Sequence, residues 1–296
     1  ELRRQRLDDV VLDLLQIEAP QADLVEWGRM VERVKNPSSG TVRIAVVGKY
    51  TELVDAYKSV QQGLIHGGIA NDVKVKIEWV SSERYEAGAL ERHFEGFDGL
   101  LIPGGFGDRG IEGMLMAIEW ARENGLPFFG ICLGLQCAII EYARNVSGRT
   151  GANSLEFDPD TEYPVICLMD SQQQVTTKGG TMRLGEYAAS LQEGSRVEEV
   201  YADQEIKERH RHRYEVNNEY RELFERSGLI MSGTSSDQGL VEVIELPDHP
   251  WFIACQFHPE LKSRPNRPHP LFASFIKGAA AHAAGSQTRA AVGAQE

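Results

Sequence analysis

The chain has 296 residues and a formal net charge of −13, which argues against a nucleic-acid-binding protein because phosphate contacts need a basic surface. Hydrophobic residues make up 42% and charged residues 25%, as in an ordinary globular protein. No apolar run in the sequence approaches the length of a membrane span, so we expect no membrane contact. Metal-ligand spacing is absent among Cys132, Cys137, Cys167 and Cys255, so we expect no metal and a reducing, cytoplasmic setting.

The first forty residues differ from the rest of the chain. Apolar residues recur at helical spacing in residues 8–17 and again in residues 23–34, which predicts two helices. The run NPSSG at residues 36–40 then indicates a linker.

From residue 41 onward, strand-like segments alternate with helix-like segments. This alternation predicts an α/β fold with a mostly parallel central sheet and helices on both faces. Residues 151–221 are less regular, and we expect the Ala/Gly-rich residues 279–296 to form a frayed, low-complexity tail. The predicted strands are 42–47, 74–80, 100–102, 128–131 and 164–168, and the predicted helices are 55–67, 110–124 and 136–144.

One cysteine occupies a very short turn, GICLG at residues 130–134, between a predicted strand and a predicted helix. Such a turn exposes one side chain at the end of a sheet, and the flanking glycines permit strained dihedral angles. The start of the following helix favours the thiolate form of Cys132. The alternative is a buried structural cysteine packed beside glycines, which an isolated match does not exclude.

A histidine that could serve as the base follows another strand-like run, at FHPE in residues 257–260. Glu260 lies two residues after His258 and could hold its imidazole in one tautomer. Cys132 and His258 are far apart in sequence and would meet only through the fold, as catalytic Cys/His pairs usually do.

A glycine-rich loop, PGGFG at residues 103–107, follows the strand at 99–102. Its exposed N–H groups could bind the oxyanion that forms when a thiolate attacks a carbonyl. We expect the N–H groups of Gly105 and Leu133 to be the two donors. Without the cysteine, this loop would be interpreted only as a tight turn.

These three motifs, in this order, resemble the class I (triad) glutamine amidotransferase domain. Five further motifs make the chain similar to the CTP synthase family over residues 2–277: VGKY (47–50), DAYKSV (55–60), GTMRLG (180–185), RHRHRYEVNN (209–218) and HPLF (269–272). The resemblance implies an amidotransferase domain at 41–278 and the end of a synthetase (amidoligase) domain with its linker at 1–40. It also implies that the chain is a fragment without most of the ATP- and UTP-using domain.

The activity implied by this resemblance is hydrolysis of L-glutamine to glutamate and ammonia through a thioester on Cys132. In the family, the synthetase domain uses the ammonia for ATP-dependent amination of UTP to CTP. ATP and Mg²⁺ would then be cofactors of the full-length enzyme and not of this fragment, GTP would be an allosteric activator, and the full-length enzyme would be a homotetramer.

The resemblance also implies a glutamine pocket. Glu156 matches the position that faces the α-amino group of glutamine, and Arg213 matches the position that holds its α-carboxylate, a role suited to a bidentate donor. Without the family match, both would be interpreted as solvated surface charges. The remaining implied pocket residues, which contribute main-chain contacts, are Gly105, Leu133, Gly134, Leu135 and Gln136.

One segment departs from the family pattern, and two other functions remain open. Residues 169–178 differ from the longer, charged loop expected there, in a region that resembles a lid implicated in the response to GTP. The triad alone also fits the amidotransferase of another synthetase or a γ-glutamyl hydrolase. A catalytically silent regulatory module is the alternative outside the enzymes, against which the intact Cys132, His258 and Glu260 count.

Overall fold

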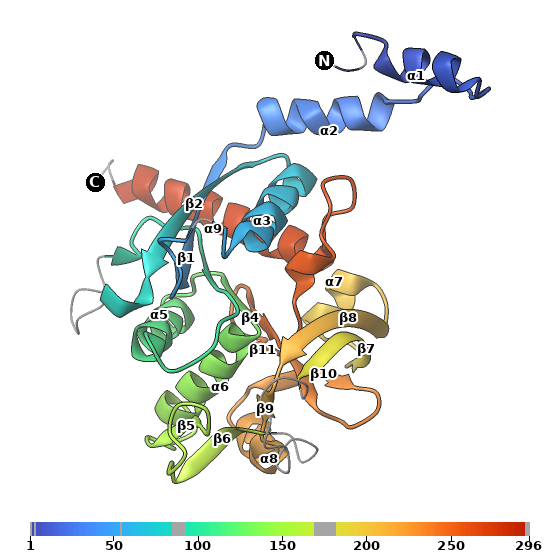
Figure 1. Ribbon diagram of the computed structural model, residues 1–296. Coiled ribbons are helices and arrows are strands. Elements are labelled where there is room, and N and C mark those ends of the chain that lie inside the picture. The colour runs from blue at the N-terminus through green and yellow to red at the C-terminus, as the bar shows by residue number, and fades with distance from the viewer. Residues whose placement is uncertain (1, 3, 54, 85–92, 169–181, 294–296) are drawn as a thin grey trace.

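The computed structural model describes residues 2, 4–53, 55–84, 93–168 and 182–293. Two N-terminal helices, α1 (Leu7–Leu15) and α2 (Val25–Lys35), agree with the two predicted helices and extend away from the α/β body (Figure 1). Neither helix buries a residue. The body begins at β1, directly after the predicted linker.

Nine strands of the described chain form one sheet in the order β2-β1-β3-β4-β12-β11-β10-β7-β8. The first five strands in this order pair in parallel, which confirms the predicted parallel core, and the last four extend it by antiparallel pairing. The strands are β1 (Thr41–Gly48), β2 (Lys74–Ser81), β3 (Gly99–Ile102), β4 (Phe128–Ile131), β7 (Arg183–Leu191), β8 (Glu205–His212), β10 (Ile230–Ser235), β11 (Val241–Glu245) and β12 (Phe252–Cys255).

Successive residues of the parallel strands belong to two separate hydrophobic cores, one on each face of the sheet. Leu100 and Phe128 pack with α5 (Ile111–Glu123) and α6 (Leu133–Asn145), whereas Leu101 packs with α3 (Lys58–Asn71) and α9 (Pro270–Gly293). Strand side chains alternate between faces, so a continuous apolar run is what a strand covered on both sides requires. The predicted arrangement of helices on both faces is therefore confirmed.

The predicted frayed tail is wrong for the described part of the C-terminus, because α9 continues to Gly293. Ala279 is fully buried, and a Cβ atom added to Gly278 would lie 3.1 Å from the Cβ atom of Trp251. Alanine is the strongest helix former, and small side chains allow the helix to lie close to its neighbours. Close packing is thus seen where this helix passes Trp251, at residues 278–279.

A second, smaller sheet and two short helices complete the described body. Strands β5 (Ala152–Ser154), β6 (Tyr163–Leu168) and β9 (Tyr214–Val216) form this sheet, and the helices are α7 (Arg196–Tyr201) and α8 (Arg221–Arg226). The departure noted at residues 169–178 lies outside the described residues. Within the described ranges, no helix is long and apolar enough to cross a membrane.

The sheet order brings the three predicted catalytic motifs to one place. Strands β3, β4 and β12 are parallel neighbours, so their carboxyl ends share one edge of the sheet. The PGGFG loop follows β3, Cys132 follows β4, and His258 comes shortly after β12. Ligand sites of such sheets lie at this edge.

We predict that Gly67→Ala destabilises the body by separating α3 from α9. A Cβ atom at position 67 would lie 2.6 Å from the backbone oxygen of Phe272, and overpacking of this kind costs about 1–3 kcal/mol. Thermal unfolding of the full chain should show a lower melting temperature. The matched control is Gly28→Ala in α2, where a Cβ atom would meet nothing within 4 Å; an equal loss in both variants would contradict the packing account.

Candidate active site

Cys132 stands in a strained turn between β4 and α6. Its φ is 54° and its ψ is −99°, a conformation that costs a residue other than glycine about 1–3 kcal/mol. The turn is held because the N–H of Cys132 donates to the carbonyl of Cys255 on the neighbouring strand at 2.7 Å. A Cβ atom at Gly134 would lie 2.3 Å from the carbonyl oxygen of Ile102, so the helix approaches β3 only because this position is glycine.

The start of α6 leaves N–H groups available beside the sulfur. The N–H groups of Leu135 and Gln136 donate to the carbonyl oxygen of Cys132, at 3.1 and 3.2 Å. Within the described part of the chain, neither Leu133 nor Gly105 donates its N–H to a backbone carbonyl. The N–H groups of Leu133 and Gly105 are the two donors predicted for the oxyanion. The positive end of the dipole of α6 also favours negative charge there.

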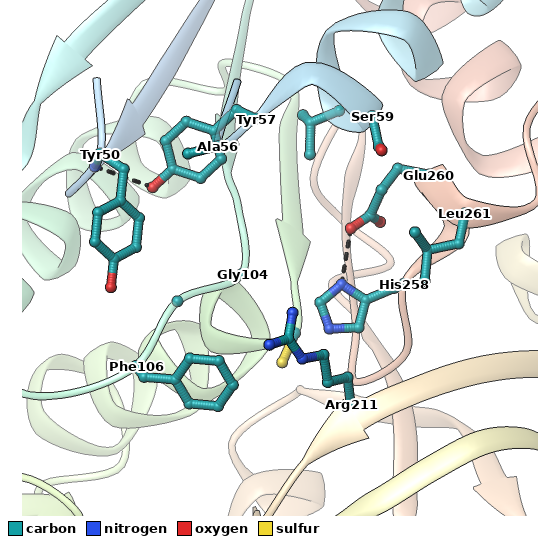
Figure 2. A pocket seen from close by; sticks show the side chains of 13 residues that line it. Tyr50, Ala56, Tyr57, Ser59, Gly104, Phe106, Arg211, His258, Glu260 and Leu261 are labelled. Carbon is teal, nitrogen blue, oxygen red and sulfur yellow. Dashed lines mark hydrogen bonds and ion pairs between the residues drawn. The ribbon is translucent and has the colours of Figure 1, made fainter. Parts of the chain in front are cut away.

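His258 is held by Glu260, which lies on the short 3-10 helix η4 (Pro259–Leu261). The Nδ1 atom of His258 lies 2.7 Å from a carboxylate oxygen of Glu260, and Figure 2 shows this contact at the wall of a cavity. Both side chains are largely buried. The hydrogen bond leaves the Nε2 atom of His258 as the nitrogen available for proton transfer.

Cys132 and His258 lie against the same side of Gly104. A Cβ atom at Gly104 would lie 2.9 Å from Cε1 of His258 and 3.6 Å from the Cβ atom of Cys132. Burial lowers the pKa of His258, but the adjacent Cys132 and Glu260 outweigh burial and raise this pKa to about 11. His258 is therefore an imidazolium beside the sulfur of Cys132. Nε2 of His258 reaches no described acceptor at ordinary hydrogen-bond length, so the contact is loose, as is common in catalytic sites without substrate.

Two cavities meet at Cys132. One has a volume of about 390 Å³ and is lined by aromatic rings, among them Tyr50, Tyr57 and Phe106, together with Arg211 (Figure 2). The other is a hollow of only about 20 Å³, room for about one water molecule, and we call it the narrow hollow. Its lining residues are Gly105, Phe106, Cys132, Gln136, Glu156, His212, Arg213 and Tyr214.

The narrow hollow collects most of the residues predicted to bind glutamine. Glu156 and Arg213 lie in its wall with Gln136, although they come from three separate parts of the sequence. An oxygen of Glu156 accepts a hydrogen bond from the N–H of Gly107 at 2.8 Å, which ties the carboxylate to the PGGFG loop. The predicted pocket residues Leu133, Gly134 and Leu135 are buried and do not line the hollow, and the side chain of Leu135 belongs to the hydrophobic core.

Lys49 is a buried cation that contacts the PGGFG loop. Its buried ammonium donates to the carbonyl oxygens of Phe106 and Gly107, so it holds the PGGFG loop in place. Burial lowers the pKa of Lys49, although nearby acidic groups such as Glu156 oppose that effect. Its signals in the sequence are its place at the end of a buried strand and its membership of the VGKY motif.

In the RHRH run of β8 (residues 209–212), every second side chain is buried, and these buried side chains form a wall. His210 and His212 are buried, and burial, followed by the charge of Arg183, lowers their pKa to about 2 and about 3. Both rings are therefore neutral near pH 7. Arg183 is also buried and donates to Glu242 at 2.6 Å, so the wall that leads to Arg213 is cross-linked by polar contacts.

Comparison with known proteins agrees with this geometry. Residues 52–278 match the model of the glutamine amidotransferase class-I family. The chain belongs to the class I glutamine amidotransferase family. In structure, this amidotransferase resembles the glutaminase domain of CTPS from Trypanosoma brucei, solved with bound acivicin, at a TM-score of 0.76 and 40% identity over 81% of this chain and 94% of that one.

Curated relatives narrow the similarity further. The amidotransferase is 54% identical over 277 residues to the CTP synthase of Caldanaerobacter subterraneus subsp. tengcongensis, covering 94% of this chain and 51% of the relative. It is 56% identical over 276 residues to the CTP synthase of Desulfitobacterium hafniense, covering 93% of this chain and 52% of the relative. The chain thus spans about half the length of the relatives that it matches.

We predict that Glu260→Gln lowers the pKa of His258, since a neutral amide replaces one of the two negative neighbours. In the wild-type chain, the raised pKa of His258 means that its charged ring stabilises the fold. This contribution is fully present below 6.5, the ordinary pKa of histidine, and is lost as pH rises through about 11. The variant should lose it at lower pH. NMR titration of the His258 ring measures the pKa, and unfolding at several pH values measures the stability.

The control for this experiment is Glu222→Gln, which changes an exposed carboxylate in α8. It should leave the titration of His258 unchanged. An unchanged His258 titration in Glu260→Gln would show that the carboxylate does not sustain the imidazolium.

Proposed function

We propose that the chain hydrolyses L-glutamine with Cys132 as the nucleophile. The observation that supports this most strongly is the sulfur of Cys132 in a strained turn beside the imidazolium of His258, with the N–H groups of Gly105 and Leu133 close to the same turn. Cysteine hydrolases use this combination of nucleophile, acid–base group and oxyanion donors.

The first half of the reaction forms a thioester. The sulfur of Cys132 bonds to the carbon of the side-chain amide, and the carbonyl electron pair moves to oxygen, where the N–H groups of Gly105 and Leu133 stabilise it. His258 gives its proton to the amide nitrogen, the carbon–nitrogen bond breaks as the carbonyl re-forms, and ammonia leaves. The second half hydrolyses the thioester. Water attacks the thioester while His258 takes its proton, the carbon–sulfur bond breaks, and glutamate leaves with the thiolate restored.

The narrow hollow is the proposed site for the amino-acid end of glutamine. Arg213 offers a planar, bidentate partner for the α-carboxylate, and Glu156 offers a negative charge for the α-ammonium. Main-chain groups of residues 133–136 complete the proposed pocket. Because the hollow admits only about one water molecule, its walls must separate when glutamine binds.

We further propose that the ammonia passes to a synthetase domain that converts UTP to CTP with ATP and Mg²⁺, within a cytoplasmic homotetramer. The curated relatives are named CTP synthase and are about twice as long as this chain. Residues 1–40 would be the end of that domain and its linker. Apolar side chains on α1 support this placement, since Leu14 is 78% exposed and Leu15 62% exposed, as expected for a helix that packs against further protein.

GTP is the proposed activator. The cavity of about 390 Å³ has rings that could stack on a purine base, from Tyr50, Tyr57 and Phe106, and a cation suited to phosphate in Arg211. A nucleotide there would lie directly beside Cys132 and His258 and could influence both.

Ammonia release from glutamine tests this function. Cys132→Ala should abolish release, and Arg213→Leu should raise KM by about 100-fold with a smaller change in kcat, because it removes a charged, bidentate partner of the substrate. Arg226→Leu, an exposed arginine in α8, is the matched control and should behave as wild type. Equal release by wild type and Cys132→Ala would overturn the proposed function.

The same assay with GTP tests the activator. GTP should increase ammonia release by the wild-type chain, and Arg211→Leu should lose that increase while it keeps basal release. Stimulation of the two chains by the same factor would remove the cavity at Arg211 as the GTP site.

A further inference from the structure

A buried glutamine that the proposed mechanism does not use reaches the sulfur of Cys132. Gln256 follows β12, its side chain is fully buried, and its Nε2 atom lies 3.7 Å from the sulfur, within hydrogen-bond distance for sulfur. Its backbone N–H donates to the carbonyl of Glu242 at 2.8 Å, so the residue is held at both ends.

The neighbours of Gln256 determine which end of its amide faces the sulfur. The carbonyl oxygen of Tyr214 can only accept, so Gln136 must present its Nε2 atom there, at 3.0 Å. The same Nε2 atom lies 3.3 Å from Gln256, which must therefore present its oxygen, Oε1. The NH₂ group of Gln256 consequently points to Cys132. A backbone carbonyl thus sets the direction of both amides.

We propose that Gln256 is a further catalytic residue that stabilises the thiolate of Cys132, and that Gln136 is the positioning residue that aims it. A donor to an anion stabilises the charged form, and a buried donor acts where water does not compete. Gln256 and Gln136 together form a relay of two side-chain amides. This relay connects the sulfur to Tyr214, which lies next to Arg213 in the wall of the narrow hollow. Two side-chain amides therefore connect the sulfur to the wall of the hollow by hydrogen bonds.

This proposal rests on the nucleophilic role of Cys132, but the measurement that decides it does not require glutamine. The test measures alkylation of Cys132 by iodoacetamide as a function of pH in the full chain, with the modified peptide identified by mass spectrometry. The charged groups around the sulfur are the same in every variant: His258, Glu260 and Arg211 line one cavity, and Glu156 and Arg213 line the other.

The main variant is Gln256→Met, which keeps the length and volume of the side chain and removes the donor. Its half-reactive pH should rise by about one unit, as expected when one hydrogen bond to a charged group is lost. The kcat for ammonia release should fall about tenfold while KM changes less than about twofold, since the donor acts on the nucleophile. Gln192→Met, at an exposed glutamine, is the matched control and should change neither quantity.

Gln136→Met is the second variant. If Gln256→Met does not fold, the half-reactive pH of Gln136→Met decides the test. It leaves Gln256 present but free to turn, so the half-reactive pH should rise in the same direction by a smaller amount. An unchanged half-reactive pH in folded Gln256→Met, or in Gln136→Met where only that variant folds, would overturn the proposal. A shift in half-reactive pH in a chain that never releases ammonia would instead overturn the proposed function and leave the relay standing.

Discussion

The left-handed backbone at Cys132 is the constraint on which the site depends. Strand β4 ends at Ile131 and α6 begins at Leu133, so Cys132 alone makes the turn, with a φ of 54°. The neighbouring glycines let α6 approach β3. The strain is balanced by the hydrogen bond to Cys255 and by the two hydrophobic cores on either side of the sheet. As a result, the sulfur is held at the edge of the sheet with the start of a helix directly behind it.

The neighbouring charges distinguish Cys132 from two other buried cysteines. Cys137 and Cys255 are buried as well, and burial raises the pKa of each thiol, to about 12 for Cys137. Cys132 differs because it lies beside the imidazolium of His258, whose charge is sustained by Glu260. Cys132 and Cys137 thus lie a few residues apart with different neighbours, and a neighbouring cation is what favours a reactive thiolate.

Much of this architecture could be predicted from sequence, and physical reasons explain which strands and contacts could not. Cys132 and His258 each follow an apolar strand, so their meeting at one edge follows from parallel topology. Strands β7, β8, β10 and β11 of the large sheet were not predicted. In β8, buried residues alternate with exposed charged residues in a run that resembles a solvated basic segment. Lys49 belongs to the VGKY motif, but its contact with Phe106, like that of Gln256 with Cys132, joins residues distant in sequence, which no local pattern predicts.

The most direct measurement of the central claim is mass spectrometry of the full chain, quenched rapidly after mixing with glutamine and then digested into peptides. The account predicts a transient increase in mass, by one glutamyl group, on the peptide that contains Cys132. It also predicts that this adduct persists longer when the quench is acidic, because His258 cannot then activate water. A glutamyl adduct on any other peptide, or ammonia release that proceeds with no adduct at the earliest times, would contradict it.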